Sequence, residues 1–422
     1  MNVLVLCYAI SPTRGSEYAV SWNYVTHMSR YHNLTILYGT SGDHMGDCRE
    51  MNDFLETHCL PNVRFYKVAP SRLCNILNYP NVKGYFGFAF YWAYHEWHKL
   101  ARQEAIRLCQ ITHFDVVHFL CPIGYREPGY LWELGMPYIW GPIGGTHNPS
   151  ICLYKALPVC SRVKLACKSI VNILQLHYGR QLKHALQQTD ILLTATTDSH
   201  NDFIHVHAKD NIYLPENGIL GDVSLNYEKF VDCKRYRVVV AARIDANKAI
   251  IILLRSLIKM QYKERIIVDI IGDGPQLIRL KKYVKKHGID DMVIFHGALP
   301  RAQVIEYFNK CHLHVITSIS EGNPTVIWEA MSRGVPTLTL DHCGMHDVVC
   351  DKCGIRIPVD GYNAIIDNIS CQLDELIASP KRFIELAEGT IECAKKFKWE
   401  NRIPIFNKCY EDAILLHQKR RR

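Results

Sequence analysis

The residues best suited to chemistry lie in a stretch that begins at Ser318 and reads SISEGNPTVIWEAM. Glu321 precedes a helix expected at residues 324–333, and Glu329 lies about a turn and a half inside that helix. The two carboxylates therefore address different parts of a ligand, which favours hydrogen bonds from ligand hydroxyls over an acid–base pair. An acidic loop before an ordinary capped helix is the alternative interpretation.

The start of the same helix is suited to an anion. Asn323 is expected at the N-cap and Pro324 at the first helical position. The amides near Gly322 and Thr325 then carry unshared N–H groups and a partial positive charge. Gly322 also lets a ligand approach the backbone closely. We therefore expect this end of the helix to bind a group such as a diphosphate.

Two further polar groups follow strands in this half of the chain. Arg243 and Lys248 flank a turn after a strand expected at residues 237–242, where two cations could neutralise a diphosphate. Gly272, Asp273 and Gly274 form a strong turn signal after a strand expected at residues 266–271. Basic residues flank many strands, so the cation pair indicates a diphosphate site only in combination with the other motifs.

Short apolar runs alternate with helical patterns along the whole chain, which predicts parallel sheets with helical crossovers. The first half contains expected strands at 3–7, 34–38, 116–120, 138–140 and 191–194. The second half contains them at 237–242, 266–271, 293–296, 313–317 and 337–340. Two doubly wound sheets bind ligands in the crevice outside the carboxyl ends of their strands.

The pattern restarts near residues 215–218, which sets the expected domains. Residues 1–214 form a Rossmann-like domain with a basic helical insert at 150–188. Residues 215–385 form a second Rossmann-like domain, and residues 386–422 form a helical segment that packs back toward the first. The insert contains six Lys or Arg residues and no acidic residue, and with the basic C-terminal tail it predicts contact with an anionic membrane surface. A basic lid or a packed helix is the alternative.

Composition narrows the function classes. The formal net charge is +8, but no nucleic-acid-binding module accompanies it, so no nucleic-acid partner is expected. Seventeen scattered cysteines indicate reduced thiols in a cytoplasmic protein, and Cys350 and Cys353 form one C-x-x-C pair without a second pair to complete a zinc site. The chain has no run long enough to span a membrane, and the aromatic patch at residues 85–94 is expected in the core.

The block from Arg243 to Val349 resembles the retaining GT-B glycosyltransferases of glycosyltransferase family 4. Its motifs, in family order, are R-x4-K at 243–248, IGDGP at 271–275, DDMVIFHG at 290–297, E-x7-E at 321–329, EAMSRGVP at 329–336 and CGMHDVV at 343–349. The N-terminal half resembles a branch that builds bacterial capsule, O-antigen or other surface polysaccharide. There the matching segments are SPTRGSE at 11–17, DVVH at 115–118, YREPG at 125–129 and WGPIGG at 140–145.

The resemblance implies a GT-B fold with two Rossmann-like domains facing a central cleft, and a role for each motif. Arg243 and Lys248 would bind the donor diphosphate, and Glu321 would accept hydrogen bonds from the donor sugar. Its further implications concern ten residues: Gly322, Asn323, Pro324 and Thr325 would contact sugar or phosphate, Glu329 would hold the ribose, Gly272, Asp273 and Gly274 would lie near the base, Gly15 would leave room for the substrates, and His118 would face the sugar. The family often has an aromatic residue and a glycine after the first glutamate, whereas here Asn323 and Pro324 follow Gly322.

The expected reaction moves a sugar from a UDP- or GDP-sugar to a glycan or lipid-linked acceptor with retention of configuration. Cations and the helix N-terminus would stabilise the leaving diphosphate, so neither metal nor cofactor is expected. A GT-B-fold UDP-sugar epimerase and a catalytically silent sugar-nucleotide-binding relative are the alternative functions. On residue type alone, a buried histidine at a strand end is the favoured interpretation of His118.

Overall fold

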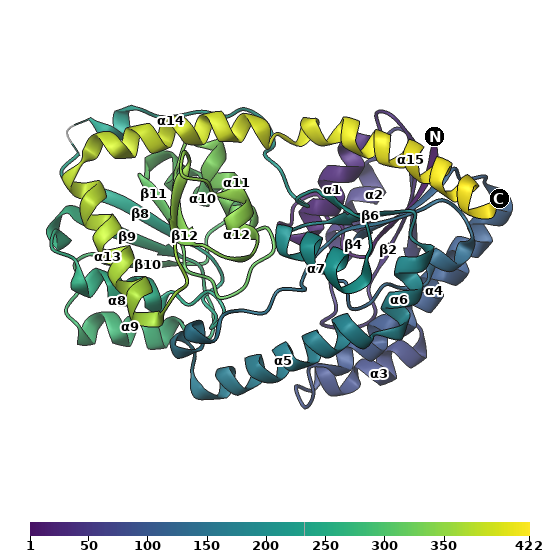
Figure 1. Cartoon of the computed structure of the whole chain (residues 1–422), viewed down its shortest axis with the longest axis horizontal. Coiled ribbons are helices and arrows are strands. Elements are labelled where there is room, and N and C mark those ends of the chain that lie inside the picture. The colour runs from purple at the N-terminus through teal and green to yellow at the C-terminus, as the bar shows by residue number, and fades with distance from the viewer. Residues whose placement is uncertain (232) are drawn as a thin grey trace. The chain divides into compact units, whose positions relative to one another are not determined.

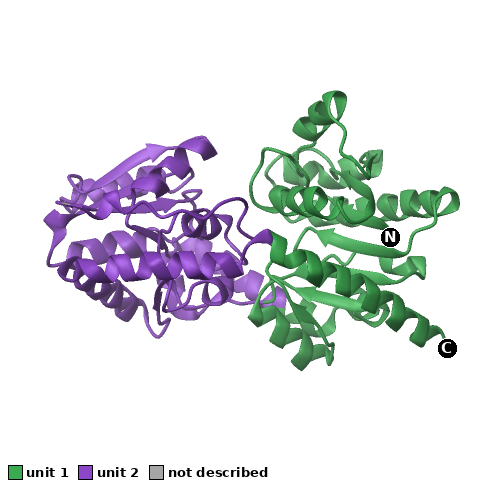
Figure 2. Cartoon of the chain, turned by 90° about the horizontal axis from the view of Figure 1, so that it is seen from above, with its two compact units in different colours: residues 1–146, 173–216, 400–422 green, residues 147–172, 217–399 purple. Residues whose placement is uncertain are grey.

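The computed structural model describes residues 1–231 and 233–422, which form two compact units (Figure 2). Unit 1 comprises residues 1–146, 173–216 and 400–422, and unit 2 comprises residues 147–172 and 217–399. The division at residues 216 and 217 lies close to the one expected. Two differences concern packing: residues 147–172 belong with unit 2 rather than with the first half, and the C-terminal segment of unit 1 begins at residue 400 rather than 386.

Unit 1 contains a seven-stranded parallel sheet in the order β3-β2-β1-β4-β5-β6-β7 (Figure 1). Its strands are β1 (Asn2–Cys7), β2 (Asn33–Gly39), β3 (Val63–Val68), β4 (Val116–Cys121), β5 (Tyr138–Ile143), β6 (Ile191–Thr194) and β7 (Ile212–Tyr213). The central strands β1, β4 and β5 are buried along nearly their whole length, as continuous apolar runs in parallel sheets require. The strand order reverses between β1 and β4.

The helices of unit 1 connect these strands or lie at its C-terminal end. They are α1 (Glu17–Met28), α2 (Arg49–Thr57), α3 (Arg72–Val82), α4 (Ala89–Ile111), α6 (Arg180–Gln188), α7 (Thr197–His207) and α15 (Ile403–Arg421). Helix α5 (Val159–Tyr178) contains the division between units at residues 172 and 173. Within unit 1, α15 is fixed by polar contacts, since the buried hydroxyl groups of Tyr24 and Tyr410 form a hydrogen bond and His32 Nε2 lies 2.8 Å from Asn407 Oδ1.

Unit 2 contains a six-stranded parallel sheet in the order β10-β9-β8-β11-β12-β13. Its strands are β8 (Tyr236–Ala241), β9 (Ile266–Ile271), β10 (Val293–Gly297), β11 (Leu313–Ile316), β12 (Thr337–Leu340) and β13 (Gly354–Ile357). Its helices are α8 (Ile251–Lys259), α9 (Leu277–Lys286), α10 (Arg301–Lys310), α11 (Thr325–Ser332), α12 (Cys343–Val348), α13 (Tyr362–Ala378) and α14 (Pro380–Lys396). In this sheet the order reverses between β8 and β11.

The reversal places helices on both faces of the unit 2 sheet. Right-handed crossovers from β8 toward β10 put α8 and α9 on one face, and crossovers in the other direction put α10, α11 and α12 on the opposite face, as Figure 1 shows. The α/β class with two doubly wound sheets is thus confirmed. Loops after β8 and β11 flank the reversal point, which is where such sheets bind ligands.

Two local expectations were wrong. The aromatic patch at residues 85–94 is not a core segment throughout, because Tyr85 is 79%, Phe88 58% and Trp92 53% exposed, whereas Tyr94 is buried. Helix α11 begins at Thr325 with Pro324 as its N-cap, one residue later than expected, and Asn323 precedes the cap. In the parts of the chain that the structure describes, every helix is too short or too polar to cross a membrane.

Candidate functional site

The loop after β8 and the loop after β11 are joined at the reversal point by backbone and side-chain hydrogen bonds. The Asn247 amide side chain donates to the Ser320 carbonyl at 2.8 Å, and the Ile319 N–H donates to the Asn247 carbonyl at 2.7 Å. The Thr317 hydroxyl donates to the carbonyls of Lys248 and Ala249, each at 3.2 Å. These bonds fix the two loops relative to each other before any ligand arrives.

Lys248 and Glu321 face each other across this junction. The Lys248 ammonium forms an ion pair with Glu321 Oε1, and both side chains are mostly buried, with 22% and 15% of their surfaces exposed. The Lys248 N–H also donates to Asp245 Oδ1 at 3.2 Å, which fixes the turn that carries it. A cation and a carboxylate at adjoining positions can bind a ligand whose anionic and hydroxyl-bearing parts are adjacent.

Arg243 lies earlier in the same loop and differs from Lys248 in its surroundings. Its side chain is exposed, and among residues 1–231 and 233–422 it has no salt-bridge partner. The backbone beside it is fixed, because the Ile244 N–H donates to the Asp273 carbonyl at 2.9 Å and the Gln276 N–H donates to the Ile244 carbonyl at 3.0 Å. Arg243 therefore offers a guanidinium from a rigid base to an incoming anion.

The turn at Gly272, Asp273 and Gly274 packs directly against that loop. Gly272 has φ +139°, and a Cβ there would lie 1.9 Å from the Ala242 carbonyl oxygen. At Gly274, a Cβ would lie 2.4 Å from the Ile244 carbonyl oxygen. Side chains at either position would push the two loops apart, which explains the glycines physically. The Asp273 carboxylate accepts a hydrogen bond from the Gly274 N–H at 2.7 Å.

Helix α11 carries the second glutamate. Glu329 Oε1 accepts a hydrogen bond from Arg301 Nε at 2.7 Å, and 14% of the Glu329 side chain is exposed. Burial raises the pKa of Glu329 above its ordinary value, and the charge and hydrogen bond of Arg301 act against that rise. Glu321 and Glu329 thus have different cationic partners, as their expected separation requires. Arg301 could not be predicted as a site residue from the sequence, because a basic residue at the start of α10 carries no motif of its own.

The N-terminus of α11 is positioned from the start of unit 2. Asn217 is buried, and its side-chain amide donates to Thr325 Oγ1 at 3.3 Å. Asn323 and Pro324 are buried and Gly322 is exposed, so the backbone becomes accessible just before the helix. The Gly344 N–H on α12 donates to the Glu321 carbonyl at 3.3 Å, and this bond fixes the backbone just before α11. The sequence signal that could have identified Asn217 is the Asn-Gly pair where the second half begins.

A His and Cys group lies beside the same loop. His147, His342 and Cys343 bring potential metal-ligand atoms within 4.8 Å of one another. His342 Nε2 lies 3.0 Å from the Ser318 carbonyl oxygen, so this group adjoins the segment that carries Glu321. The expectation that no metal is needed stays a prediction, and this group is the place where it can be tested.

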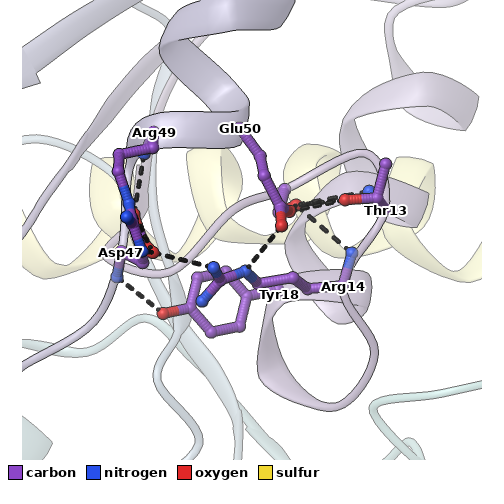
Figure 3. A network of polar contacts seen from close by, with 7 residues as sticks. Thr13, Arg14, Tyr18, Asp47, Arg49 and Glu50 are labelled. Atoms are coloured by element: carbon purple, nitrogen blue, oxygen red, sulfur yellow. Dashed lines mark hydrogen bonds and ion pairs between the residues drawn. The ribbon is translucent and has the colours of Figure 1, made fainter. Parts of the chain in front are cut away.

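Gly15 lies in the loop between β1 and α1, which a polar network holds (Figure 3). Arg14 Nη2 lies 2.8 Å from Asp47 Oδ2, and Arg14 Nε lies 3.1 Å from Glu50 Oε1. The Ser11 and Thr13 hydroxyls donate to Glu50, which ties the middle of the loop to the start of α2. Hydrogen bonds from Arg49, together with Arg14, lower the pKa of Asp47. A Cβ on Gly15 would meet no atom within 4 Å, so the space that this glycine leaves is open.

His118 lies on β4 in the interior of unit 1, with 0% of its surface exposed. Its Nε2 lies 2.7 Å from the Gly141 carbonyl oxygen and its Nδ1 lies 3.1 Å from the Tyr410 hydroxyl. Burial lowers the pKa of His118 to about 4, so the ring is neutral near pH 7. With both nitrogens engaged, the geometry favours the interior alternative, and the sugar-facing role stays a prediction.

Comparison with known proteins assigns the second half of the chain. The family model described as glycosyl transferases group 1 matches residues 228–396. An uncharacterized glycosyltransferase of Methanocaldococcus jannaschii is 26% identical over 149 residues, which are 34% of this chain and 40% of that protein. The lipopolysaccharide 1,6-galactosyltransferase of Salmonella typhimurium is 30% identical over 129 residues, which are 30% of this chain and 35% of that protein. These matches cover well under half of each curated relative.

Solved structures extend the likeness in fold to almost the whole chain. The apo form of the lipopolysaccharide outer core galactosyltransferase WaaB has a TM-score of 0.64 at 17% identity, covering 97% of this chain and 99% of that one. Anabaena HepE in complex with UDP and glucose has a TM-score of 0.61 at 13% identity, covering 97% and 98%. Residues 228–396 are therefore a glycosyl transferases group 1 domain, carried in a chain with the GT-B fold.

Proposed function

We propose that this protein is a retaining glycosyltransferase that moves a sugar from a nucleotide diphosphate-sugar to a glycan or lipid-linked acceptor in surface-polysaccharide synthesis. The observation that carries the proposal is the contact between Lys248 and Glu321 at the reversal point of the unit 2 sheet. In a nucleotide-sugar the sugar is bonded directly to the outer phosphate. A cation for phosphate and a carboxylate for sugar hydroxyls must then be neighbours, and these two side chains are.

The remaining groups extend this assignment along the donor. Arg243 has an exposed guanidinium for the diphosphate, and the accessible backbone before α11 supplies N–H groups. Glu329, restrained by Arg301, would accept from the ribose hydroxyls, and the turn at Gly272–Gly274 would lie near the base. Anabaena HepE, whose structure contains UDP and glucose, supports a nucleotide-sugar donor for a chain with this fold.

The proposed chemistry is stabilisation of the leaving group. Cleavage of the sugar–phosphate bond leaves negative charge on the diphosphate, which Arg243, Lys248 and the N-terminus of α11 would balance as it develops. The departing phosphate oxygen would then take the proton of the acceptor hydroxyl as that hydroxyl attacks the same face of the sugar. The new glycosidic bond keeps the configuration of the old one, and no metal enters the step.

The test is turnover of a panel of UDP- and GDP-sugars by the purified chain, followed by mass spectrometry with and without lipid-linked and oligosaccharide acceptors. We expect acceptor-dependent release of the nucleotide diphosphate and a product of unchanged anomeric configuration by NMR. Isomerised donor in the absence of acceptor would instead establish an epimerase. Donor binding without turnover by any acceptor would establish a silent relative.

We further propose that the enzyme works on an anionic membrane surface, where a lipid-linked acceptor lies. Helix α5 exposes Val163, Ile170 and Leu174 by 60%, 58% and 52%, beside exposed Lys164 and Lys168. The exposed aromatic patch on unit 1 lies in a second stretch, residues 57–95, that contains no Asp or Glu. Apolar side chains among basic ones are suited to the lipid headgroup region, where each basic residue contributes roughly 1 kcal/mol.

The basic C-terminal tail contributes less than its sequence indicates. Arg420 Nη2 lies 3.2 Å from Asp190 Oδ1, and the Arg421 guanidinium donates to the Gly135 carbonyl, so both hold the end of α15 on unit 1. Sedimentation with vesicles of anionic or neutral lipid tests the surface. We expect salt-sensitive binding to anionic vesicles that Lys164→Glu with Lys168→Glu abolishes. Equal sedimentation with both lipids would contradict the proposal.

A further inference from the structure

Three cysteines of unit 2 lie together although they are far apart in the sequence. Cys350 and Cys353 lie in the loop between α12 and β13, and Cys393 lies on α14. The Cys350 sulfur is 3.6 Å from the Cys353 sulfur and 3.5 Å from the Cys393 sulfur, and all three sulfurs lie within 4.8 Å of one another. The fold thus adds a third thiol to a C-x-x-C pair that had no further ligand in the sequence.

These distances fit one ion bound at the centre. Zinc–sulfur bonds are about 2.3 Å long, so two sulfurs of a tetrahedral zinc site lie roughly 3.8 Å apart. Two of the three sulfur pairs are already within a few tenths of an ångström of that separation. A disulfide would use two of the three cysteines and leave the third without a role, whereas a metal ion uses all three.

The loop is held in this conformation by contacts from three directions. The Cys353 N–H donates to the Cys350 carbonyl at 2.9 Å, and the Cys350 N–H donates to Cys353 Sγ at 3.3 Å. Gly354 follows, and a Cβ there would lie 2.1 Å from the Thr337 carbonyl oxygen on β12. From α14, the Thr390 hydroxyl donates to the Cys353 carbonyl at 3.2 Å, and this bond positions the turn of α14 that carries Cys393 beside the loop. The thiols are therefore positioned by the fold.

The surroundings of the three thiols favour a soft cation and leave one of the thiols accessible to solvent. Cys353 and Cys393 are buried, at 2% and 4% exposure, within an apolar cluster that includes Val348 and Ala394. Cys350 is partly exposed at the edge of that cluster. Soft thiolates favour zinc and copper(I) over magnesium or calcium. Three protein ligands leave one coordination position for water or a small external thiol.

We propose that Cys350, Cys353 and Cys393 form a zinc site that clips the loop before β13 to α14. Binding would replace the three thiol protons, which pass to the solvent, with one Zn²⁺ and a fourth external ligand. None of the three cysteines is among the donor-binding residues, and the expected effect of the site is on the stability of unit 2. A ligand that binds the folded chain and not the unfolded chain raises the unfolding temperature by mass action.

The experiment uses the full, reduced chain, freed of metal and titrated with Co²⁺ as a spectroscopic probe and with Zn²⁺ as competitor. We expect thiolate-to-Co²⁺ charge-transfer absorption that saturates at one ion per chain, is removed by Zn²⁺, and is lost in Cys350→Ser and in Cys393→Ser. Zn²⁺ should raise the unfolding temperature of the wild type and of neither variant. Cys371→Ser, at an exposed cysteine on α13, is the matched control and should bind like the wild type.

Cys350→Ser keeps the test decisive if loss of the buried Cys393 thiol prevents folding, because Cys350 lies at the edge of the cluster. Absence of charge-transfer absorption in the wild type would overturn the proposal. Absorption that persists in both folded variants would overturn it as well, since exposed cysteines such as Cys160 and Cys167 would then be the ligands. A disulfide between two of the three cysteines, formed with peroxide in chain that binds no Co²⁺, would replace the metal site with a redox pair.

Discussion

The two units place a cationic loop at the same topological position and use it differently. In unit 1 the loop between β1 and α1 carries Arg14, which is neutralised by Asp47 and Glu50 of the same unit. In unit 2 the loop between β8 and α8 carries Arg243, which is exposed and has no salt bridge in the described chain, and Lys248, which meets Glu321 alone. Arg14 is thus engaged by two carboxylates, whereas the unit 2 loop leaves the Arg243 guanidinium without an ion pair among the described residues.

The difference shows where an anionic ligand gains most. An anion approaching Arg14 must compete with two carboxylates held by hydrogen bonds, so little net attraction is left. An anion approaching Arg243 meets an exposed guanidinium with no salt bridge in the described chain, in the same loop as Lys248, whose partner Glu321 lies just before the N-terminus of α11. The assignment of the donor to unit 2 depends on this available guanidinium and on the neighbouring N-terminus of α11.

The largest expected effect is that of Lys248→Ala. It removes a cation from the diphosphate and leaves the mostly buried Glu321 carboxylate without its partner, a loss of about 2–5 kcal/mol, or tens- to thousands-fold in donor affinity. Calorimetric titration with the donor measures it. Lys259→Ala is the matched control, because Lys259 pairs with Asp367 at an exposed position of the same unit and should change affinity little. Equal losses in the two variants would contradict the site.

A smaller loss is expected for Arg243→Ala, because Arg243 is exposed and no buried carboxylate depends on it. Removal of one charged hydrogen bond typically costs about 1.5–3 kcal/mol. Arg243→Lys should recover part of the affinity, because the charge returns without the planar fork. Arg14→Ala provides the comparison in unit 1: it should lower the unfolding temperature and leave donor affinity in place. Loss of donor binding in Arg14→Ala alone would reverse the comparison.

Replacing Glu329 or Arg301 should weaken donor binding by an amount that depends on the ribose of the donor. Glu329→Gln should weaken a donor that carries both ribose hydroxyls by about 1–3 kcal/mol, and it should weaken a 2′-deoxy donor less. Arg301→Ala should act in the same direction, because it removes the cation that faces Glu329. Burial already raises the pKa of that carboxyl, and Arg301 acts against the rise. Inhibition constants for UDP and 2′-deoxy-UDP with each variant measure the difference. Equal losses for both nucleotides would place Glu329 away from the ribose.

Much of this arrangement could be predicted from the sequence, because continuous apolar runs and turn residues are local signals. The strands around Val238 and Val268 are of this kind, and so is the Gly272–Gly274 turn. The edge strand β3, with its mixture of apolar and basic residues, gave no such signal, and it is only partly buried. Contacts between distant segments were not predictable in principle: Arg301 with Glu329 and Cys393 with Cys350 depend on how helices cross a sheet.

Acid should destabilise both units through buried histidines. Burial lowers the pKa of His118 and of His98 in unit 1 to about 4, and it does the same for His312 in unit 2. The ordinary value is 6.5, so between these values the unfolded chain binds more protons than the folded chain. The free energy of unfolding therefore rises with pH across this window, and the contribution of these histidines is lost as pH falls from about 6.5 toward 4.

Urea unfolding at pH 7 and pH 5 measures this loss in the wild type and in His118→Asn. The variant should be less stable at pH 7, since it alters the bonds to Gly141 and Tyr410, but its stability should change less with pH. His113→Asn is the control, because the His113 side chain is 86% exposed and its replacement should leave the pH dependence as it is. A pH dependence that is the same in His118→Asn and the wild type would contradict a neutral, buried His118.

The smallest expected effect is that of a strong chelator on turnover. If Arg243, Lys248 and the N-terminus of α11 balance the leaving diphosphate, no metal is needed there, and activity should survive EDTA unchanged. The same treatment should lower the unfolding temperature of zinc-loaded chain, because the thiol site uses other residues than the donor site. Loss of activity that manganese or magnesium restores would contradict metal independence. His342→Ala then identifies the site of the ion. If manganese or magnesium no longer restores activity in this variant, the group of His147, His342 and Cys343 beside Ser318 holds the ion.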